Sequence, residues 1–348
     1  MIDVADEANA LTGASASTAT STPTVEAAGR AQARSAAPAP GGRRGSGASV
    51  RKRLEITIFV APALVLFGLF VVWPIIRAVQ FSFYKWKGYG PLKNFVGLDN
   101  YASVLQNDVF TGAFTHNMII VVASIAIQLP LGLGIALLLN RKMRGQSVLR
   151  TIIFVPYVLA EVIAGVVWYQ MLVADEGVMD TLLSAIGLSG PEQGFLGDPK
   201  YALWTVIAVL TWKYLGLAII LFLAGLQGVP DELYEAAQID GASWWQIQRR
   251  ITIPMLGPTL RTWAFLSMVG SLQLFDMVWI LTGGGPANST TTMATFLINE
   301  GTKRSNYGIA SAASVILFVV ALIMALLYQR FVMRRDNTVT VVRKKAAR

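Results

Sequence analysis

The sequence contains no cysteine, a single histidine and few charged residues, which make up 14% of its 348 positions. Without cysteine there can be no disulfide, no thiolate metal ligand and no cysteine nucleophile. The one histidine, His116, excludes a histidine-rich metal centre and argues against a serine–histidine triad. A Gly-x-x-x-x-Gly-Lys-Ser/Thr phosphate-binding run is also missing from the sequence. We therefore expect no catalytic residue, no metal site and no cofactor in this chain, and an ATPase would have to be a separate polypeptide.

Long apolar runs occupy much of the chain. Soluble domains are about a quarter charged, so the low charged fraction, together with 54% hydrophobic residues, indicates an integral membrane protein. Six apolar runs of about 20 residues or more are each long enough to cross a bilayer core of about 30 Å as a helix. These runs are Leu54–Val79, Asn117–Leu139, Leu149–Val173, Ala202–Leu226, Thr259–Leu281 and Ile309–Phe331. The predicted fold class is an all-α membrane protein with six transmembrane helices.

The two ends of the chain differ from its middle. Residues 1–50 are rich in Ala, Ser, Thr, Gly and Pro and show no apolar periodicity, so we predict a disordered tail there. They do not form a signal peptide, because the first apolar run begins too late. We assign residues 51–333 to a transmembrane domain, with a polar loop at 229–258, and residues 334–348 to a basic tail.

Lysine and arginine are distributed unequally between the two sides of the predicted spans. If the N-terminus is cytoplasmic, 20 of the 29 Lys and Arg residues fall in cytoplasmic segments. Six fall in the external loops, namely Lys85, Lys87, Lys93, Lys200, Lys303 and Arg304. This asymmetry predicts that both termini lie in the cytoplasm. It also explains the net charge of +9 through membrane-flanking residues, so we expect no nucleic-acid partner.

The polar loop 229–258 has the pattern of two short helices joined by a turn. Pro230 is suited to open the first helix, because its missing N–H would be unpaired there. Gly241 is suited to end that helix in a left-handed conformation. Ser243 and Gln246 have the spacing of a capping box for the second helix, which we expect Pro254 to stop.

The same loop carries a family resemblance. Glu235-Ala236-Ala237, three further residues, Gly241, nine residues and Ile251-Thr252-Ile253-Pro254 resemble the motif of permease subunits of ATP-driven, binding-protein-dependent importers. The one departure is Ile253, where the family has Leu. In that family the loop is a coupling helix that docks into the ATPase subunit from the cytoplasmic membrane face. The resemblance therefore implies a coupling role for Glu235, Ala236, Ala237, Asp240 and Gly241. The alternative is an ordinary helical hairpin between two spans.

Other segments narrow the resemblance to the sugar-importing branch of these permeases. They are Leu223–Gln227, Phe275-Asp276, Leu281–Pro286 and Tyr307-Gly308. The similarity covers most of residues 54–332 and neither tail. It implies a type I importer fold, a second permease chain, two ATPase subunits, an extracellular sugar-binding protein and a bacterial cell membrane. The branch is known for di- and oligosaccharides and also for glycerol phosphate.

Polar residues in the outer half of the fifth predicted span are candidates for a sugar route. Gln273, Asp276 and Trp279 are spaced three apart and would share one face of a continuous helix. Amide and carboxylate groups can bond to sugar hydroxyls, and an aromatic ring can cover the apolar C–H patches of a sugar. The alternative is a polar seam that packs two helices together.

Lys213 is an unusual residue near the middle of the fourth predicted span. A charge at that depth costs several kcal/mol unless it faces protein or water. It is either a lysine that is paired or reaches the interface, or a residue that lines the translocation path. Glu161, in the third predicted span, poses the same question and is a possible partner for Lys213.

Three other functions compete with sugar import. The same architecture is compatible with import of a polyol, glycerol phosphate or an amino acid. A secondary transporter or channel would require an inverted repeat and more intramembrane carboxylates, and we find no clear repeat. A membrane scaffold or receptor subunit would leave the Glu-Ala-Ala spacing unexplained.

Overall fold

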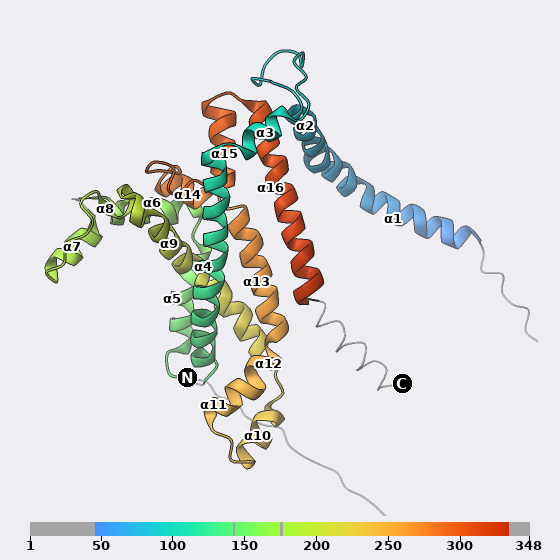
Figure 1. Ribbon diagram of the computed structural model, residues 1–348. Coiled ribbons are helices and arrows are strands. Elements are labelled where there is room, and N and C mark those ends of the chain that lie inside the picture. The colour runs from blue at the N-terminus through green and yellow to red at the C-terminus, as the bar shows by residue number, and fades with distance from the viewer. Residues whose placement is uncertain (1–45, 142, 175–176, 334–348) are drawn as a thin grey trace, which may run out of the picture. The chain divides into compact units, whose positions relative to one another are not determined.

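The computed structural model describes residues 46–141, 143–174 and 177–333 (Figure 1). The C-terminal tail 334–348 and most of the N-terminal tail, residues 1–45, lie outside the described residues. Helix α1 (Ser46–Phe67) begins within the stretch 1–50 that the sequence assigned to the tail. The chain divides into two compact units after Pro62, and the sites described below belong to the second unit.

The described part of the chain is helical and contains no β-strand, although Tyr84 and Phe95 form an isolated bridge. Four helical segments in that part are long and apolar enough to cross a membrane. They are Ile56–Ser82, which runs from α1 into α2 (Trp73–Ser82); α4 (Asp108–Leu139); α9 (Pro199–Leu226); and Tyr307–Met333, which begins with α16 (Tyr307–Tyr328). These segments confirm the first, second, fourth and sixth predicted spans. Their ends lie within three residues of the prediction, except that the second begins at Asp108, well before the predicted Asn117.

The third predicted span is not one straight helix. It consists of α5 (Gln146–Val158) and α6 (Glu161–Leu172), whose axes are bent by 97°. Leu159 and Ala160 between them have ψ angles of 140° and 143°, which are extended values and interrupt the helix. If this bent pair counts as one span, the described residues contain five spans.

The fifth predicted span is also broken, so the count of six is not obtained. Helix α13 (Gly257–Leu272) has only 16 residues, and α14 (Asp276–Leu281) follows after a non-helical step. The amide of Asn117 donates to the backbone carbonyls of Ser271 and Leu272 at 2.7 and 3.3 Å. Because a side chain from another helix satisfies these carbonyls, α13 can end inside the structure.

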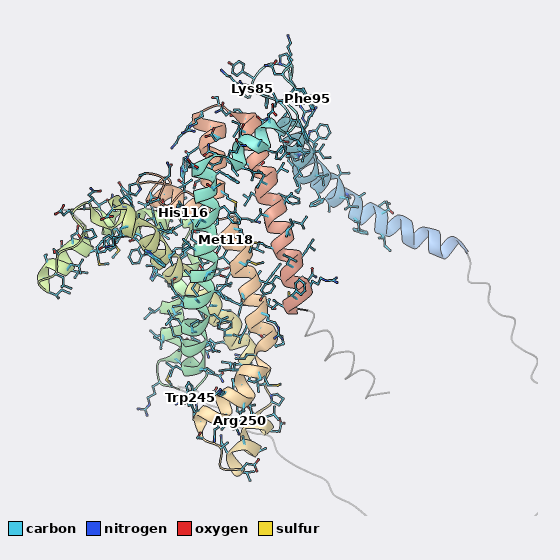
Figure 2. The ribbon with its side chains drawn as sticks, in the orientation of Figure 1. Lys85, Phe95, His116, Met118, Trp245 and Arg250 are labelled. Atoms are coloured by element: carbon cyan, nitrogen blue, oxygen red, sulfur yellow. The ribbon has the colours of Figure 1, made fainter. Side chains whose placement is uncertain are left out.

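The remaining helices are short and lie in the connections. They are α3 (Asp99–Leu105), α7 (Val178–Ala185), α8 (Gly194–Gly197), α10 (Asp231–Ile239), α11 (Trp244–Ile247), α12 (Ile253–Met255) and α15 (Met293–Ile298). Figure 1 shows α10 and α11 at the end of the long helices that is opposite to α3 and α15. In Figure 2, Trp245 and Arg250 mark the first of these ends, and Lys85 and Phe95 mark the other.

Helices α4 and α9 form the centre of the packing. Each of the three apolar clusters in the described residues includes side chains of α4, and two of them include side chains of α9. The two helices approach closely at Gly132, where a Cβ atom would lie 3.0 Å from Ala218 and 3.1 Å from the ring of Phe222. Small residues allow such close packing between membrane helices. The residues of α9 are therefore well placed to organise an internal site.

Candidate functional site

The turn after α10 has the left-handed glycine that the sequence predicted. Gly241 has φ +73°. Its N–H donates to the carbonyl of Gln238 at 3.0 Å, and the N–H of Ala242 donates to that of Ala237 at 2.9 Å. This pair of bonds is a Schellman motif, which satisfies the last carbonyls of the helix. The polypeptide can make this turn cheaply only because position 241 lacks a Cβ atom.

The capping box of the second helix is confirmed, but its predicted end is wrong. The N–H of Ser243 donates to Gln246 Oε1 at 2.7 Å, and the N–H of Gln246 donates to Ser243 Oγ at 3.4 Å. The helical path then continues through a wider π-helical turn, Gln248–Thr252, and into α12. Pro254 lies in the first turn of α12, directly after this wider turn, where the missing N–H of a proline is tolerated. The helical path therefore includes Pro254 and ends at Met255.

The proposed coupling residues lie on an exposed surface. Glu235, Ala236, Asp240 and Gly241 are exposed, and Ala237 is half-buried. Next to them, Ile239 is 86% exposed and Trp245 is 70% exposed, although both are apolar. Large apolar side chains that are exposed beside charged ones are available for contact with a protein partner. We call residues 231–252, from α10 through the π-helical turn, the coupling loop, after the role that the family resemblance predicts for it.

The coupling loop is held together by its own contacts. The hydroxyl of Thr252 donates to that of Tyr234 at 3.3 Å, which connects the π-helical turn to α10. The rings of Trp244 and Trp245 stack with centroids 5.3 Å apart, and Arg141 lies 5.2 Å above the ring of Trp244. These contacts fix the positions of α10, α11 and the π-helical turn relative to one another, so the loop presents a single ordered surface to a partner.

A cavity of about 120 Å³ lies among α4, α9 and α13. Its lining combines hydroxyl and amide groups with aromatic and aliphatic side chains, and none of the described residues that line it is charged. The polar lining residues are Ser124, Gln128, Tyr214, Ser267 and Ser271. Trp263 adds an indole that is only 2% exposed. Most of the lining surface is apolar, and the five polar side chains can bond to hydroxyl groups of an uncharged ligand.

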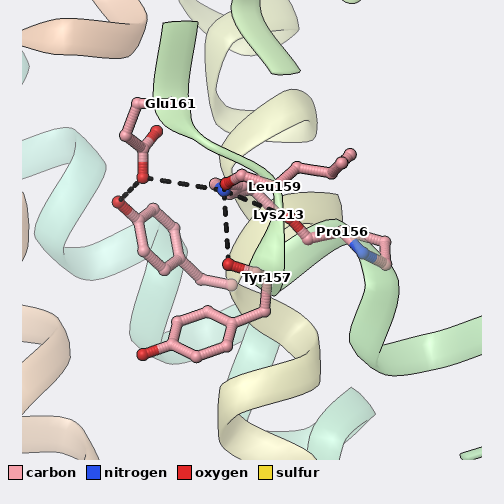
Figure 3. A network of polar contacts seen from close by, with 6 residues as sticks. Pro156, Tyr157, Leu159, Glu161 and Lys213 are labelled. Carbon is pink, nitrogen blue, oxygen red and sulfur yellow. Dashed lines mark hydrogen bonds and ion pairs between the residues drawn. The ribbon is translucent and has the colours of Figure 1, made fainter. Parts of the chain in front are cut away.

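Lys213 is buried beside this cavity and does not line it. Its ammonium donates to the carbonyls of Pro156 at 3.1 Å, Tyr157 at 3.4 Å and Leu159, as Figure 3 shows. These carbonyls lie where α5 ends and would otherwise lack partners inside the structure. The three donors of the lysine thus satisfy the three carbonyls. Of the two sequence interpretations, the structure places Lys213 as a paired lysine, and a path-lining role for it stays a prediction.

Glu161 lies at the first position of α6 and joins the same network. Its Oε1 atom is 3.9 Å from the ammonium of Lys213 and accepts a hydrogen bond from the hydroxyl of Tyr214 at 2.8 Å. The pairing of Glu161 with Lys213 that the sequence raised as a possibility is therefore present. Tyr214 connects this network to the cavity, because it also lines the cavity wall.

The interpretation of Gln273, Asp276 and Trp279 as one helical face is wrong. Gln273 follows the last residue of α13, and Asp276 opens α14 after the break. Trp279 packs against Phe275, with ring centroids 5.3 Å apart, and carries the ammonium of Lys303 4.7 Å above its ring. The structure thus separates Gln273 from the other two, and none of the three lines the cavity. Their role on a sugar route stays a prediction.

Sequence reasoning missed the serine and glutamine residues of the cavity. Ser124 and Gln128 are four apart in the second predicted span, and Ser267 and Ser271 are four apart in the fifth. Polar residues at that spacing share one face of a helix. Polar groups within an apolar span are costly unless they face protein or water. This spacing of polar residues could have predicted the cavity from the sequence. The interpretation of the spans rested instead on charged residues such as Lys213, Glu161 and Asp276.

Residues 128–337 match the family described as "Binding-protein-dependent transport system inner membrane component". The chain belongs to this family. It is a membrane-embedded permease component of a transport system that depends on a binding protein, and not an enzyme. The match includes the coupling loop and most of the cavity.

Individual relatives of this permease agree with the family assignment. The chain is 37% identical to a probable ABC transporter permease of Pyrococcus horikoshii, over 78% of this chain and 94% of that protein. It is 33% identical to the trehalose/maltose transport system permease MalF of Thermococcus litoralis, over 78% of this chain and 91% of that protein. Its structure resembles a chain of the bacterial alginate ABC transporter, solved with an alginate pentasaccharide-bound periplasmic protein. That likeness has a TM-score of 0.73, 26% identity and coverage of 83% of this chain and 97% of that chain.

Proposed function

We propose that the chain is a transmembrane permease subunit of an ATP-driven importer of sugars of di- or oligosaccharide size. The observation that carries the sugar class in this proposal is the uncharged cavity among α4, α9 and α13, with its hydroxyl, amide and indole groups. The di- or oligosaccharide size is taken from the trehalose/maltose and alginate systems. Hydroxyls and amides can exchange hydrogen bonds with sugar hydroxyls, and aromatic faces cover the C–H surface of a sugar ring. The trehalose/maltose and alginate systems among its relatives support a carbohydrate substrate.

The permease provides half of the translocation path in this proposal. A second permease chain provides the other half, two ATPase subunits bind ATP, and an external binding protein delivers the sugar. Both termini lie on the cytoplasmic side of a bacterial cell membrane, in keeping with the lysine and arginine asymmetry. ATP binding closes the ATPase pair, and the coupling loop moves with it and reorients the spans.

The cavity also bears on the alternative substrates. A phosphate group would require arginine or lysine near it, and the described lining residues of this cavity include neither. This argues against glycerol phosphate and leaves a polyol as the stronger alternative of the same class. A secondary transporter or channel is the alternative of another class, and it would give no function to the coupling loop.

Uptake measurements in a strain that lacks this permease test the proposal directly. We expect the strain to lose ATP-dependent uptake of at least one labelled sugar from a panel of maltose, trehalose, lactose and a cello-oligosaccharide. Reintroduction of the gene should restore that uptake. Xylitol and glycerol 3-phosphate serve as the probes for the alternative substrates. Loss of uptake for either of these, with every sugar unaffected, would contradict sugar import.

Substitution of Gln128 by leucine should weaken sugar binding in the cavity without removing the permease from the membrane. The amide is 3% exposed and lines the cavity, and leucine has a similar volume. Loss of one or two hydrogen bonds to the sugar should raise the KM for uptake about tenfold, which corresponds to about 1.4 kcal/mol. Thr115→Val, at an exposed position of the same helix, is the control. An unchanged KM in Gln128→Leu would remove the cavity from the sugar path.

Alanine variants test the outer residues separately. If Gln273, Asp276 and Trp279 line the sugar route, each replacement should reduce uptake by roughly threefold or more at normal membrane abundance, since each removes about one polar or stacking contact. Normal uptake in all three variants would exclude them from the route. Loss of uptake together with loss of abundance would instead indicate a role in packing.

A further inference from the structure

Two adjacent residues of α9 hold the two sides of the bend between α5 and α6. Lys213 binds the carbonyls at the end of α5, and Tyr214 binds Glu161 at the start of α6. Figure 3 shows Lys213 between these carbonyls and the carboxylate of Glu161. All three ammonium donors are used by carbonyls, so the 3.9 Å contact of Lys213 with Glu161 is an attraction between charges. Oxygen Oε1 of Glu161 is thereby left to accept the hydrogen bond of Tyr214.

This arrangement fixes the direction of the tyrosine hydroxyl. A phenol has one proton to donate, and an ionised carboxylate can only accept. Once Tyr214 has donated to Glu161 at 2.8 Å, its oxygen can act toward the cavity only as an acceptor. A ligand group beside it must then be a donor, such as a sugar hydroxyl. A group of the same size that only accepts, such as fluorine or a methoxy oxygen, would face an acceptor with no proton between them.

We propose that Glu161 is a positioning residue for selectivity: held beside Lys213, it makes Tyr214 a pure hydrogen-bond acceptor in the cavity, so that the permease selects a ligand hydroxyl over an acceptor-only group. The inference rests on the proposed function in taking the cavity as the sugar site. Glu161 itself does not line the cavity and acts through Tyr214. Lys213 contributes by holding its ammonium 3.9 Å from Oε1 of the carboxylate, beside the carbonyls that it binds.

The substitution Glu161→Gln isolates this effect, because it keeps the size of the side chain and changes its hydrogen-bonding capacity. The glutamine amide offers an N–H donor beside its acceptor oxygen, so Tyr214 is no longer obliged to donate to position 161 and its proton is free to point into the cavity. Tyr214→Phe removes the hydroxyl altogether. Glu192→Gln, at an exposed position, makes the same change of charge elsewhere and is the matched control.

The experiment compares uptake of maltose and trehalose with uptake of their monodeoxyfluoro counterparts, in the full transporter reconstituted with its binding protein. In the unmodified permease, fluorine at one hydroxyl position should raise the KM about tenfold, in line with loss of one hydrogen bond. In Glu161→Gln and in Tyr214→Phe this ratio should fall at least threefold. Glu192→Gln should retain the original ratio. The same ratio in Glu161→Gln as in the unmodified permease, at normal Vmax, would overturn the proposal.

A second measurement needs no sugar and separates failure of this inference from failure of the proposed function. The melting temperature of the purified transporter is compared for Glu161→Leu, Tyr214→Phe and the double variant. If the hydroxyl donates to Glu161, Tyr214→Phe should lower the melting temperature in the original background and have little effect in the Glu161→Leu background. Strictly additive shifts would overturn the inference. Absence of maltose and trehalose uptake, together with a non-additive cycle, would support the network and count against these sugars as substrates.

Discussion

Replacement of Gly241 with valine should leave the permease in the membrane and reduce the sugar-stimulated ATP hydrolysis of the assembled transporter about tenfold, equivalent to about 1.4 kcal/mol. The backbone at this position has φ +73°, which costs a residue with a Cβ atom about 1–2 kcal/mol and a β-branched residue more. A Cβ atom at Gly241 would meet no other atom of the described chain within 4 Å. The effect therefore arises from distortion of the turn and from contact with a docked partner, and not from a clash within the permease.

The assay is ATP hydrolysis by the reconstituted transporter with its binding protein, with and without the transported sugar. Gly241→Asn is the matched control, because asparagine tolerates the left-handed region better than valine, and it should retain more of the stimulation. Glu235→Ala should also lower stimulation, since an exposed carboxylate on α10 is available to a partner. Unreduced stimulation in Gly241→Val, at normal yield of the assembled transporter, would reduce the coupling loop to a hairpin between spans.

Lys213→Met should greatly lower the amount of assembled transporter, and what remains should be less stable to heat. The substitution leaves the carbonyls of Pro156, Tyr157 and Leu159 without the donor that now binds them. Each buried polar group that loses its partner costs about 1–3 kcal/mol. The sum is comparable with the whole stability of many domains, which is about 5–15 kcal/mol. Membrane abundance and the melting temperature of the purified transporter measure the effect.

Lys200→Met is the control for this prediction, because it makes the same change at an exposed position in the first turn of α9. It should leave abundance and melting temperature nearly unchanged. A lipid-dissolved photoprobe adds an independent measurement, since a buried lysine should not be labelled in the assembled transporter. Efficient labelling at position 213, or normal stability of Lys213→Met, would contradict its role at the bend.

The sequence by itself determined the class of the protein and the local structure of the coupling loop. Apolar length and the scarcity of charge are sufficient for the membrane assignment, since both follow from composition along a single helix. The left-handed end of the helix at Gly241 and the capping box of Ser243 and Gln246 were also predicted correctly. Their hydrogen bonds join residues a few positions apart, so the information they need is local.

Tertiary structure decided where the long helices break. Helix α13 ends at Leu272 because Asn117, more than 150 residues earlier, binds its last carbonyls. The bend after α5 depends in the same way on Lys213, which is more than 50 residues later. In an apolar environment a helix can end only where another group takes over its hydrogen bonds. The sequence of the span gives no indication of a partner that lies so far away.

The cavity likewise exists only in three dimensions. Its polar residues come from α4, α9 and α13. In the sequence, Ser124, Gln128 and Ser267 are single polar residues within two separate apolar runs, and nothing there indicates that they meet. The charged residues that drew attention in the sequence, Lys213 and Glu161, are instead engaged in holding the bend beside the cavity. A charge inside a membrane protein must be neutralised by its surroundings, which accounts for the contacts of these two residues. Only the packing of the helices reveals which uncharged groups face the space between them.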